Sequence, residues 1–217
     1  MKNKKITYAL IIINLIVFAL MEITGSSTDT KTLLKFGAMF KPLIFYGQYF
    51  RFITPIFVHI GLIHLLMNSY SLYILGPAFE SLYGSFKFLI IYILSGIMGN
   101  ILSFALADSL SISAGASTSL YGLFGLALGF TIFYRNEPYL KRFGKSFLIV
   151  IIINIFYSIT NSSIGIFGHL GGLLGGFLLS GIFSVRTVKI KSLIKIVNII
   201  LFISLSLVLL YVGFINV

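Results

Sequence analysis

The chain has 217 residues, of which 58% are hydrophobic and 10% are charged, with a mean hydropathy of +1.06 and a formal net charge of +11. Soluble domains carry about 25% charged residues, so this composition excludes a soluble globular protein and predicts an integral membrane protein. The chain contains no cysteine, which excludes disulfide frameworks and thiol chemistry.

Seven apolar segments approach the roughly 20 residues that a helix needs to cross a bilayer. They cover residues 6–23, 56–77, 86–107, 117–134, 147–160, 166–184 and 193–214. Backbone groups in lipid must be hydrogen-bonded within the protein, so all seven are predicted to be helices. The sequence therefore predicts an all-α membrane protein, a polytopic bundle of seven transmembrane helices. We expect a single domain over residues 1–217, with a core at about 1–184 and an additional C-terminal helix at about 190–217.

The basic residues indicate how this bundle is oriented. If the seven helices alternate in direction, most of the sixteen lysines and arginines fall on one side of the membrane: Lys2, Lys4, Lys5, Lys87, Arg135, Lys141, Arg142, Lys145, Arg186, Lys189, Lys191 and Lys195. The positive-inside rule then predicts a cytoplasmic N-terminus and an outer C-terminus, in what we expect to be the plasma membrane. The positive charge is thus a topology signal, and the expected partner is the lipid bilayer rather than nucleic acid.

Three polar clusters interrupt the apolar segments. His64 and Asn68 are four residues apart in the second segment, so they share a helix face. Ser117 opens the fourth segment, and His169 lies near the start of the sixth. These three segments all run from outside to inside, so the clusters are predicted to meet in the outer half of the membrane. Polar groups in transmembrane helices are unfavourable and often functional.

Glycines predict how two of the clusters approach each other. Gly172 and Gly176 follow His169 by three and seven residues and share its helix face. Small-residue strips let membrane helices pack closely, which would bring His169 within hydrogen-bond reach of Ser117. A neutral imidazole in that position can take the proton of a serine hydroxyl. Gly115 permits a tight turn before Ser117, and the free N–H groups of the first helical turn can face an oxyanion.

At these residues the sequence resembles the rhomboid intramembrane serine proteases, over most of the chain from Arg51 to about Gly176. "GASTSLYG" is similar to the family's glycine-x-serine-glycine motif, "HLGGLLGG" to its histidine-x-x-glycine-x-x-x-glycine motif, and "HIGLIHLLMN" to its helix 2 pattern. The resemblance implies Ser117 as nucleophile and His169 as general base. The supporting set that it implies comprises oxyanion groups from Asn68 and His64, a tyrosine packed on the histidine (Tyr121), and the glycines Gly115, Gly172 and Gly176.

The resemblance also implies the reaction and its setting. It implies the six-plus-one form of the fold, no cofactor and no metal, and single-pass membrane proteins cleaved near the outer face as substrates. A loop at 160–168 would cover the site, and the fifth segment would act as a gate. Glu80 would be structural, in a turn after the second segment. Two departures stand out: Thr118 replaces the glycine after the nucleophile, and Phe50 replaces a tryptophan before Arg51.

Other readings remain open at this point. A catalytically inactive relative would keep the fold and bind membrane helices. A transporter would use polar membrane residues, but the chain shows no two-fold internal repeat and no acidic residue in mid-membrane. A metalloprotease would need a motif such as H-E-x-x-H, which is absent. No acidic residue is placed to act on His169, so we expect a serine–histidine dyad rather than a triad.

Overall fold

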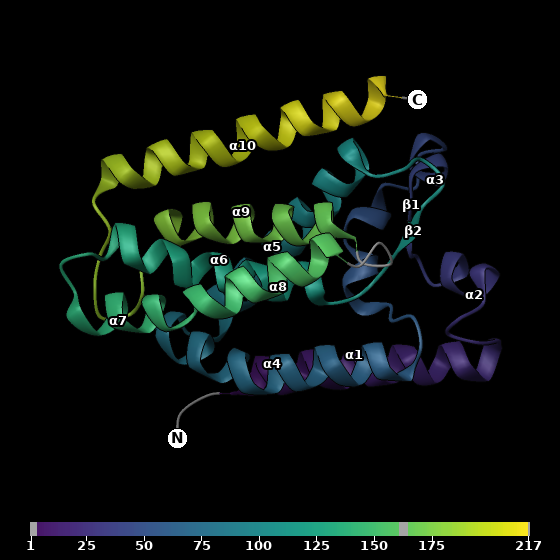
Figure 1. Cartoon of the computed structure of the whole chain (residues 1–217), viewed down its shortest axis with the longest axis horizontal. Coiled ribbons are helices and arrows are strands. Elements are labelled where there is room, and N and C mark those ends of the chain that lie inside the picture. Colours follow the sequence, from purple (N-terminus) through teal and green to yellow (C-terminus); the bar gives the residue numbers. More distant parts are fainter. Residues whose placement is uncertain (1–3, 161–164, 217) are drawn as a thin grey trace.

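The computed structural model describes residues 4–160 and 165–216, which form a bundle of helices (Figure 1). Residues 161–164, in the loop expected to cover the site, lie outside the described part. The α-helices are α1 Lys5–Thr24, α2 Thr30–Lys35, α3 Lys41–Phe45, α4 Leu62–Tyr83, α5 Ser85–Leu106, α6 Ser117–Phe133, α7 Pro138–Ser146, α8 Leu148–Thr160, α9 Ile166–Ile182 and α10 Ser192–Ile215. Two short 3-10 helices, Tyr49–Phe52 and Thr54–Phe57, and two short strands, β1 Met39–Phe40 and β2 Ile112–Ser113, lie in the connections.

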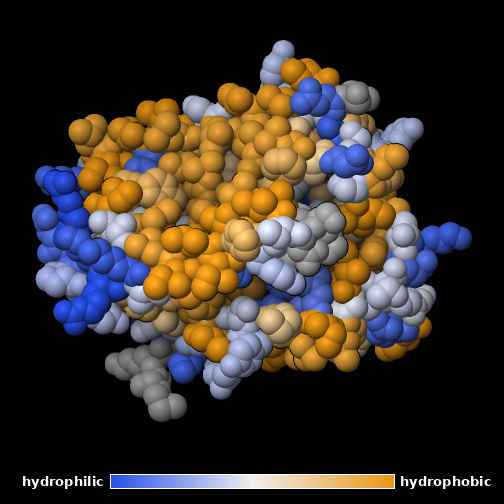
Figure 2. Space-filling model, viewed as in Figure 1, coloured by the Kyte–Doolittle hydropathy of each residue, from blue (hydrophilic) through white to orange (hydrophobic). Residues whose placement is uncertain are grey.

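The bundle is that of a multi-pass integral membrane protein. Five helical stretches are long and apolar enough to cross a membrane: Lys5–Thr24, Leu62–Tyr83, Ser85–Leu106, Pro138–Thr160 and Ser192–Ile215. Two shorter apolar helices, α6 and α9, accompany them. Figure 2 shows apolar side chains over the middle of the visible face, with hydrophilic side chains gathered toward its two ends. Such a surface suits contact with lipid rather than with water.

The two shorter helices lie in the interior of the bundle, next to α5. α10 crosses one side of this group, while α1 and α4 cross the opposite side (Figure 1). Glycines explain the close approach of α6 and α9. A Cβ on Gly172 would overlap the carbonyl oxygen of Thr118, and a Cβ on Gly176 would overlap that of Gly122. The glycine strip predicted from the sequence therefore packs directly on α6.

The second apolar segment begins and ends later than predicted. We expected it at 56–77, whereas α4 is Leu62–Tyr83. The chain before α4 forms the 3-10 turn Thr54–Phe57 and passes Gly61, whose φ of 78° suits glycine. Pro77 lies inside α4 rather than at its end, as membrane helices tolerate when neighbouring groups compensate.

Glu80 therefore lies in the last turns of α4 and not in a turn after it. Its side chain is buried and accepts hydrogen bonds from the backbone N–H groups of Ile6 (3.1 Å) and Thr7 (2.9 Å). It also accepts from the hydroxyls of Thr7 (2.7 Å) and Ser85 (2.6 Å). The first N–H groups of α1 have no acceptor within their own helix. Glu80 supplies one, and so joins the starts of α1 and α5 to the end of α4.

The long first loop is ordered by backbone pairing and by one arginine. β1 pairs antiparallel with β2, with Met39 opposite Ser113, so this loop is attached to the segment that leads into α6. The buried guanidinium of Arg51 donates hydrogen bonds to the carbonyl oxygens of Ala38 (2.6 Å) and Leu34 (2.9 Å). Phe50, the departure from the tryptophan pattern, is exposed with its ring 5.2 Å from the Arg51 guanidinium.

Candidate active site

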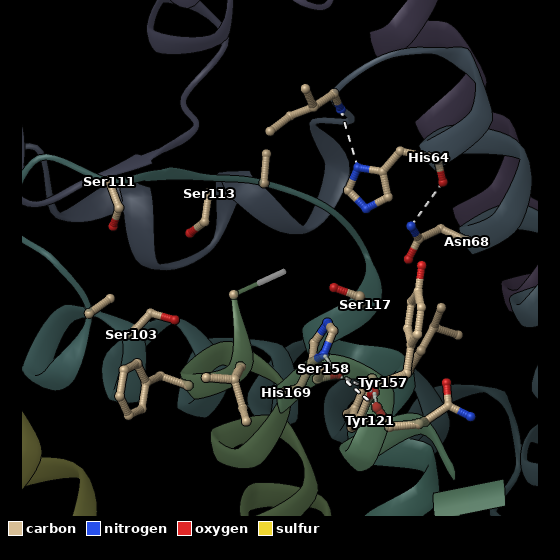
Figure 3. Close-up of a pocket in the computed structure, with 18 of the residues that line it drawn as sticks. His64, Asn68, Ser103, Ser111, Ser113, Ser117, Tyr121, Tyr157, Ser158 and His169 are labelled. Carbon is tan, nitrogen blue, oxygen red and sulfur yellow. Dashed lines mark hydrogen bonds between the residues drawn. The ribbon is translucent and has the colours of Figure 1, made fainter. Parts of the chain in front are cut away.

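A cavity of about 790 Å³ opens among α4, α6, α8, α9 and the segment before α6. Its lining brings together all three polar clusters that the sequence singled out (Figure 3). The lining residues that carry the argument are His64, Asn68, Ser117, Tyr121, Ser158 and His169. The polar residues of the second, fourth and sixth apolar segments therefore line one cavity, while their location in the outer half of the membrane stays a prediction.

Ser117 is the first residue of α6, and the backbone before it is held in a fixed turn. Gly115 has a φ of 128° and donates its N–H to the carbonyl of Pro55 (2.8 Å). A Cβ on Gly115 would lie 2.6 Å from the His64 ring, so glycine is required by both conformation and space. The Ser117 side chain is partly exposed in the cavity and has no hydrogen-bonded partner among the described residues.

The start of α6 also provides unpaired N–H groups. The first hydrogen bond along this helix runs from Leu120 N–H to the Ala116 carbonyl (3.0 Å). The N–H groups of Ser117, Thr118 and Ser119 therefore have no acceptor within the helix. They belong to the same helical turn as the Ser117 side chain, and backbone donors at such a helix start can stabilise an oxyanion in acyl transfer.

His169 lies in the first turn of α9 and is held on two sides. Its ring stacks on Tyr121, with centroids 3.9 Å apart and an interplanar angle of 10°. Its Nδ1 is hydrogen-bonded to the hydroxyl of Ser158 (2.9 Å). Figure 3 shows the ring between Ser158 and Ser117, with its other nitrogen toward Ser117. The hydrogen bond predicted between Ser117 and His169 is not among those of the described residues, so the dyad stays a prediction.

Ser158, from α8, is a site residue that sequence reasoning missed. Only 4% of it is exposed, and its hydroxyl lies 2.8 Å from the Asn154 carbonyl oxygen and 3.0 Å from the Tyr121 hydroxyl. The Tyr121 hydroxyl also donates to the Asn154 carbonyl (3.1 Å). A signal was present in the sequence, since Asn154 and Ser158 are four residues apart in a strongly apolar segment and so share one helix face.

Asn68 and His64 line the same cavity from α4. The Asn68 amide nitrogen donates one hydrogen to the His64 carbonyl (2.9 Å), which leaves its second hydrogen for another acceptor. Nδ1 of His64 accepts the N–H of Ile60 (3.4 Å), so a neutral His64 carries its proton on Nε2. Both side chains thus hold an N–H donor that is not used by the bonds described.

His59 has a positioning role that the sequence did not reveal. Its buried ring accepts the N–H of Ala116 at Nε2 (3.3 Å) and contacts the Phe57 carbonyl at Nδ1 (3.3 Å). It therefore attaches the chain before α4 to the residue that precedes Ser117. Its spacing of five from His64 is poor for one helix face, but His59 precedes α4, so helical periodicity does not apply to it. Within the described residues, no group of three His, Cys, Asp or Glu side chains is arranged to hold a metal ion.

Comparison with known proteins places this geometry in context. A family model described as the rhomboid domain matches residues 46–186. The chain is 42% identical over 171 residues to rhomboid protease GluP of Bacillus subtilis (strain 168). The aligned region covers 79% of this chain and 33% of that protein. It is 40% identical over 134 residues to the putative rhomboid protease YdcA of the same organism, covering 62% of this chain and 67% of YdcA.

A relative with lower identity is also matched over only part of its length. The chain is 33% identical over 153 residues to rhomboid-like protease 3 of Toxoplasma gondii, covering 70% of this chain and 58% of that protein. The chain thus spans between one third and two thirds of the length of these three relatives. The matched region contains every cavity residue on which the geometry above depends.

Proposed function

The chain belongs to the rhomboid family, and from this premise we propose that it is an intramembrane serine endopeptidase that uses Ser117 as nucleophile and His169 as general base. The observation that carries the proposal is the direction of the His169 ring. One nitrogen is bonded to Ser158, and the other faces the Ser117 hydroxyl, which has no hydrogen-bond partner among the described residues (Figure 3). A base oriented in this way next to a free hydroxyl is the arrangement that serine acyl transfer requires.

In this mechanism, Nε2 of His169 takes the Ser117 proton as Oγ attacks the substrate carbonyl carbon. The carbonyl π electrons move to oxygen, and the N–H of Ser117 together with the free donors of Asn68 and His64 stabilises the oxyanion. The protonated His169 then gives its proton to the leaving amine nitrogen as the C–N bond breaks. Water, deprotonated by the same nitrogen, attacks the carbonyl carbon of the acyl-enzyme. As the bond from that carbon to Ser117 Oγ breaks, the protonated His169 returns the proton to Oγ and the carboxylic acid is released.

Ser158 is the alternative nucleophile, because its hydroxyl is the one hydrogen-bonded to His169. Three features favour Ser117 instead. Ser158 is buried within α8, where its hydroxyl already contacts Asn154 and Tyr121, whereas Ser117 is partly exposed to the cavity. Ser158 lies in the last turn-and-a-half of its helix, away from the unpaired N–H groups of a helix start. Ser117 has such groups beside it.

The lengths of the helices support a site below the membrane surface. α6 and α9 each have 17 residues. At 1.5 Å per residue each spans about 25 Å, less than the roughly 30 Å of the hydrocarbon core. Ser117 is the first residue of α6 and His169 lies in the first turn of α9, so the site would be recessed in the outer leaflet and reached by water through the cavity. We propose the six-plus-one arrangement as one domain over 1–217, with α10 as the additional helix and the N-terminus in the cytoplasm.

Substrates follow from the same physics. Peptide bonds inside a stable helix are hydrogen-bonded and inaccessible to a nucleophile. We therefore propose cleavage in a segment that unwinds easily. Membership of the rhomboid family further supports single-pass membrane proteins as substrates, cleaved at a small residue near the outer face of the plasma membrane. The chemistry uses side chains of the chain itself, with no cofactor and no metal.

The decisive experiment combines a covalent probe with cleavage. A fluorophosphonate should label Ser117 of the purified protein, as mapped by mass spectrometry, and Ser117→Ala or His169→Ala should abolish cleavage across a panel of tagged single-pass proteins. Labelling of Ser158 would transfer the nucleophile to α8. A protein that neither reacts nor cleaves, yet binds the panel, would be an inactive relative; flux of a small solute would indicate a transporter.

A further inference from the structure

We propose that Ser158 is a positioning residue that holds His169 in the tautomer with the proton on Nδ1, so that Nε2 is free to act as base. The inference rests on the proposed function for its catalytic meaning. It assigns a role to a residue of α8, outside the helices that carry the nucleophile, the base and the oxyanion donors.

The hydrogen-bond donors and acceptors around Nδ1 of His169 determine where its proton lies. The Asn154 carbonyl oxygen can only accept, and the hydroxyls of Ser158 (2.8 Å) and Tyr121 (3.1 Å) both lie within hydrogen-bond distance of it. A serine hydroxyl has one proton. When Ser158 gives that proton to the Asn154 carbonyl, the bond between Ser158 and His169 requires a proton on Nδ1. Nε2 then carries a lone pair toward Ser117.

The reverse arrangement does not support catalysis. If Ser158 donated to Nδ1, the imidazole proton would lie on Nε2, and His169 could not take the proton of Ser117. That arrangement would also leave the Asn154 carbonyl with Tyr121 as its side-chain donor. The back-bond from a serine to the carbonyl four residues earlier is a common local geometry in helices, so the productive arrangement is supported by the helix itself.

Stacking by itself does not choose between the two tautomers. The Tyr121 ring lies parallel to the His169 ring and restricts its plane. Both tautomers present an equivalent aromatic face to the tyrosine, and so does the ring turned over. The hydrogen bond to Ser158 distinguishes the two ring nitrogens, as a carboxylate or carbonyl does for histidines in other sites. After proton transfer, Ser158 also accepts the hydrogen bond of the positively charged ring.

The test reads the tautomer directly. The chain has three histidines, so NMR of the ¹⁵N-histidine-labelled protein in detergent micelles gives three pairs of ring-nitrogen signals. The pair from His169 is assigned by its loss in His169→Ala. The wild type should show His169 protonated on Nδ1 at a pH where the ring is neutral. Ser158→Ala should shift that pair toward the Nε2–H tautomer or toward a mixture. His169 protonated on Nε2 in the wild type would overturn the proposal.

Kinetics supply the second readout. Ser158→Ala should lower kcat on the order of 10- to 100-fold with KM unchanged, the range for losing one hydrogen bond to a group that becomes charged. It should slow fluorophosphonate labelling of Ser117 by a similar factor, and Ser158→Thr should restore most of the turnover. The matched control is Ser146→Ala, which removes an exposed hydroxyl bonded to the Phe143 carbonyl (2.7 Å) at the end of α7. Ser146→Ala should leave kcat unchanged.

The outcomes separate this inference from the proposed function. Unchanged NMR signals and full turnover in Ser158→Ala would reject the positioning role and leave the Ser117–His169 dyad in place. Fluorophosphonate labelling of Ser158 would reject both. No labelling of any serine would reject the protease function, while the NMR signals of the wild type and Ser158→Ala would still decide whether Ser158 sets the tautomer.

Discussion

The ring of Tyr121 lies parallel to the ring of His169, with centroids 3.9 Å apart and 10° between their planes. The two side chains come from α6 and α9, so the stack spans the same interface as the glycine contacts. The Tyr121 hydroxyl extends beyond the stack to Ser158 and the Asn154 carbonyl of α8. Tyr121 of α6 thus contacts both α8 and α9, through its hydroxyl and its ring respectively, and the two can be tested separately.

Tyr121→Phe should lower kcat by only about 5-fold, because it keeps the ring and removes neutral hydrogen bonds worth about 1 kcal/mol. Tyr121→Ala removes the stacking surface and should lower kcat by more than about 10²-fold, since a base displaced by about 1 Å loses on that order. Steady-state kinetics on a purified substrate, with the thermal midpoint in detergent, would measure both. Equal losses in the two variants would contradict a role for the ring.

Asn68→Ala should lower kcat by about 10²–10³-fold, the usual effect of losing one oxyanion donor. KM should change little, because the donor acts mainly in the transition state. The control is Ser81→Ala on the same helix, an exposed serine outside the cavity lining. A raised KM with unchanged kcat would instead place Asn68 in substrate binding or packing.

Gly176→Ala should reduce activity without altering any reacting group. A Cβ at Gly176 would overlap the Gly122 carbonyl, so α9 must move away from α6 and carry His169 with it. A shift of about 1 Å predicts a loss on the order of 10²-fold in kcat, with a lower thermal midpoint. Leu174→Val, at a side chain that is 39% exposed on the same helix, should be nearly neutral. Equal activity of the two variants would show that the contact tolerates a methyl group.

Glu80→Ala should destabilise the protein more than it changes the chemistry. It leaves the buried N–H of Thr7 and the partly buried N–H of Ile6 without their acceptor, at about 1–3 kcal/mol for each buried donor left unpaired. Glu80→Gln keeps one carbonyl acceptor and should lose less. The thermal midpoint in detergent should follow the order wild type, Gln, Ala, with kcat of the folded fraction near the wild-type value. A large fall in kcat at an unchanged midpoint would contradict a structural role.

The sequence alone determined the class of the protein and the location of its polar clusters. Hydropathy identified the apolar helices, five of them long enough to cross a membrane and two shorter, because a segment in lipid must be apolar and hydrogen-bonded within itself. Helical periodicity placed Gly172 and Gly176 on one face, and the structure packs that face on α6. These properties are local: each depends on residues within a few turns of one another. The motifs around Ser117 and His169 are local in the same way, so the family resemblance was readable from them.

Tertiary structure decided what each polar group contacts. No spacing in the sequence indicates that Ser158 meets Nδ1 of His169, that His59 accepts the Ala116 N–H, or that Glu80 caps α1. Helix bounds near Pro77 were also misplaced, since a proline ends a helix in water but is tolerated where neighbouring helices compensate. Periodicity specifies which face of a helix a side chain occupies. Which of several hydroxyls reaches a given imidazole nitrogen depends on how α6, α8 and α9 pack, and that is set by contacts between residues far apart in the chain.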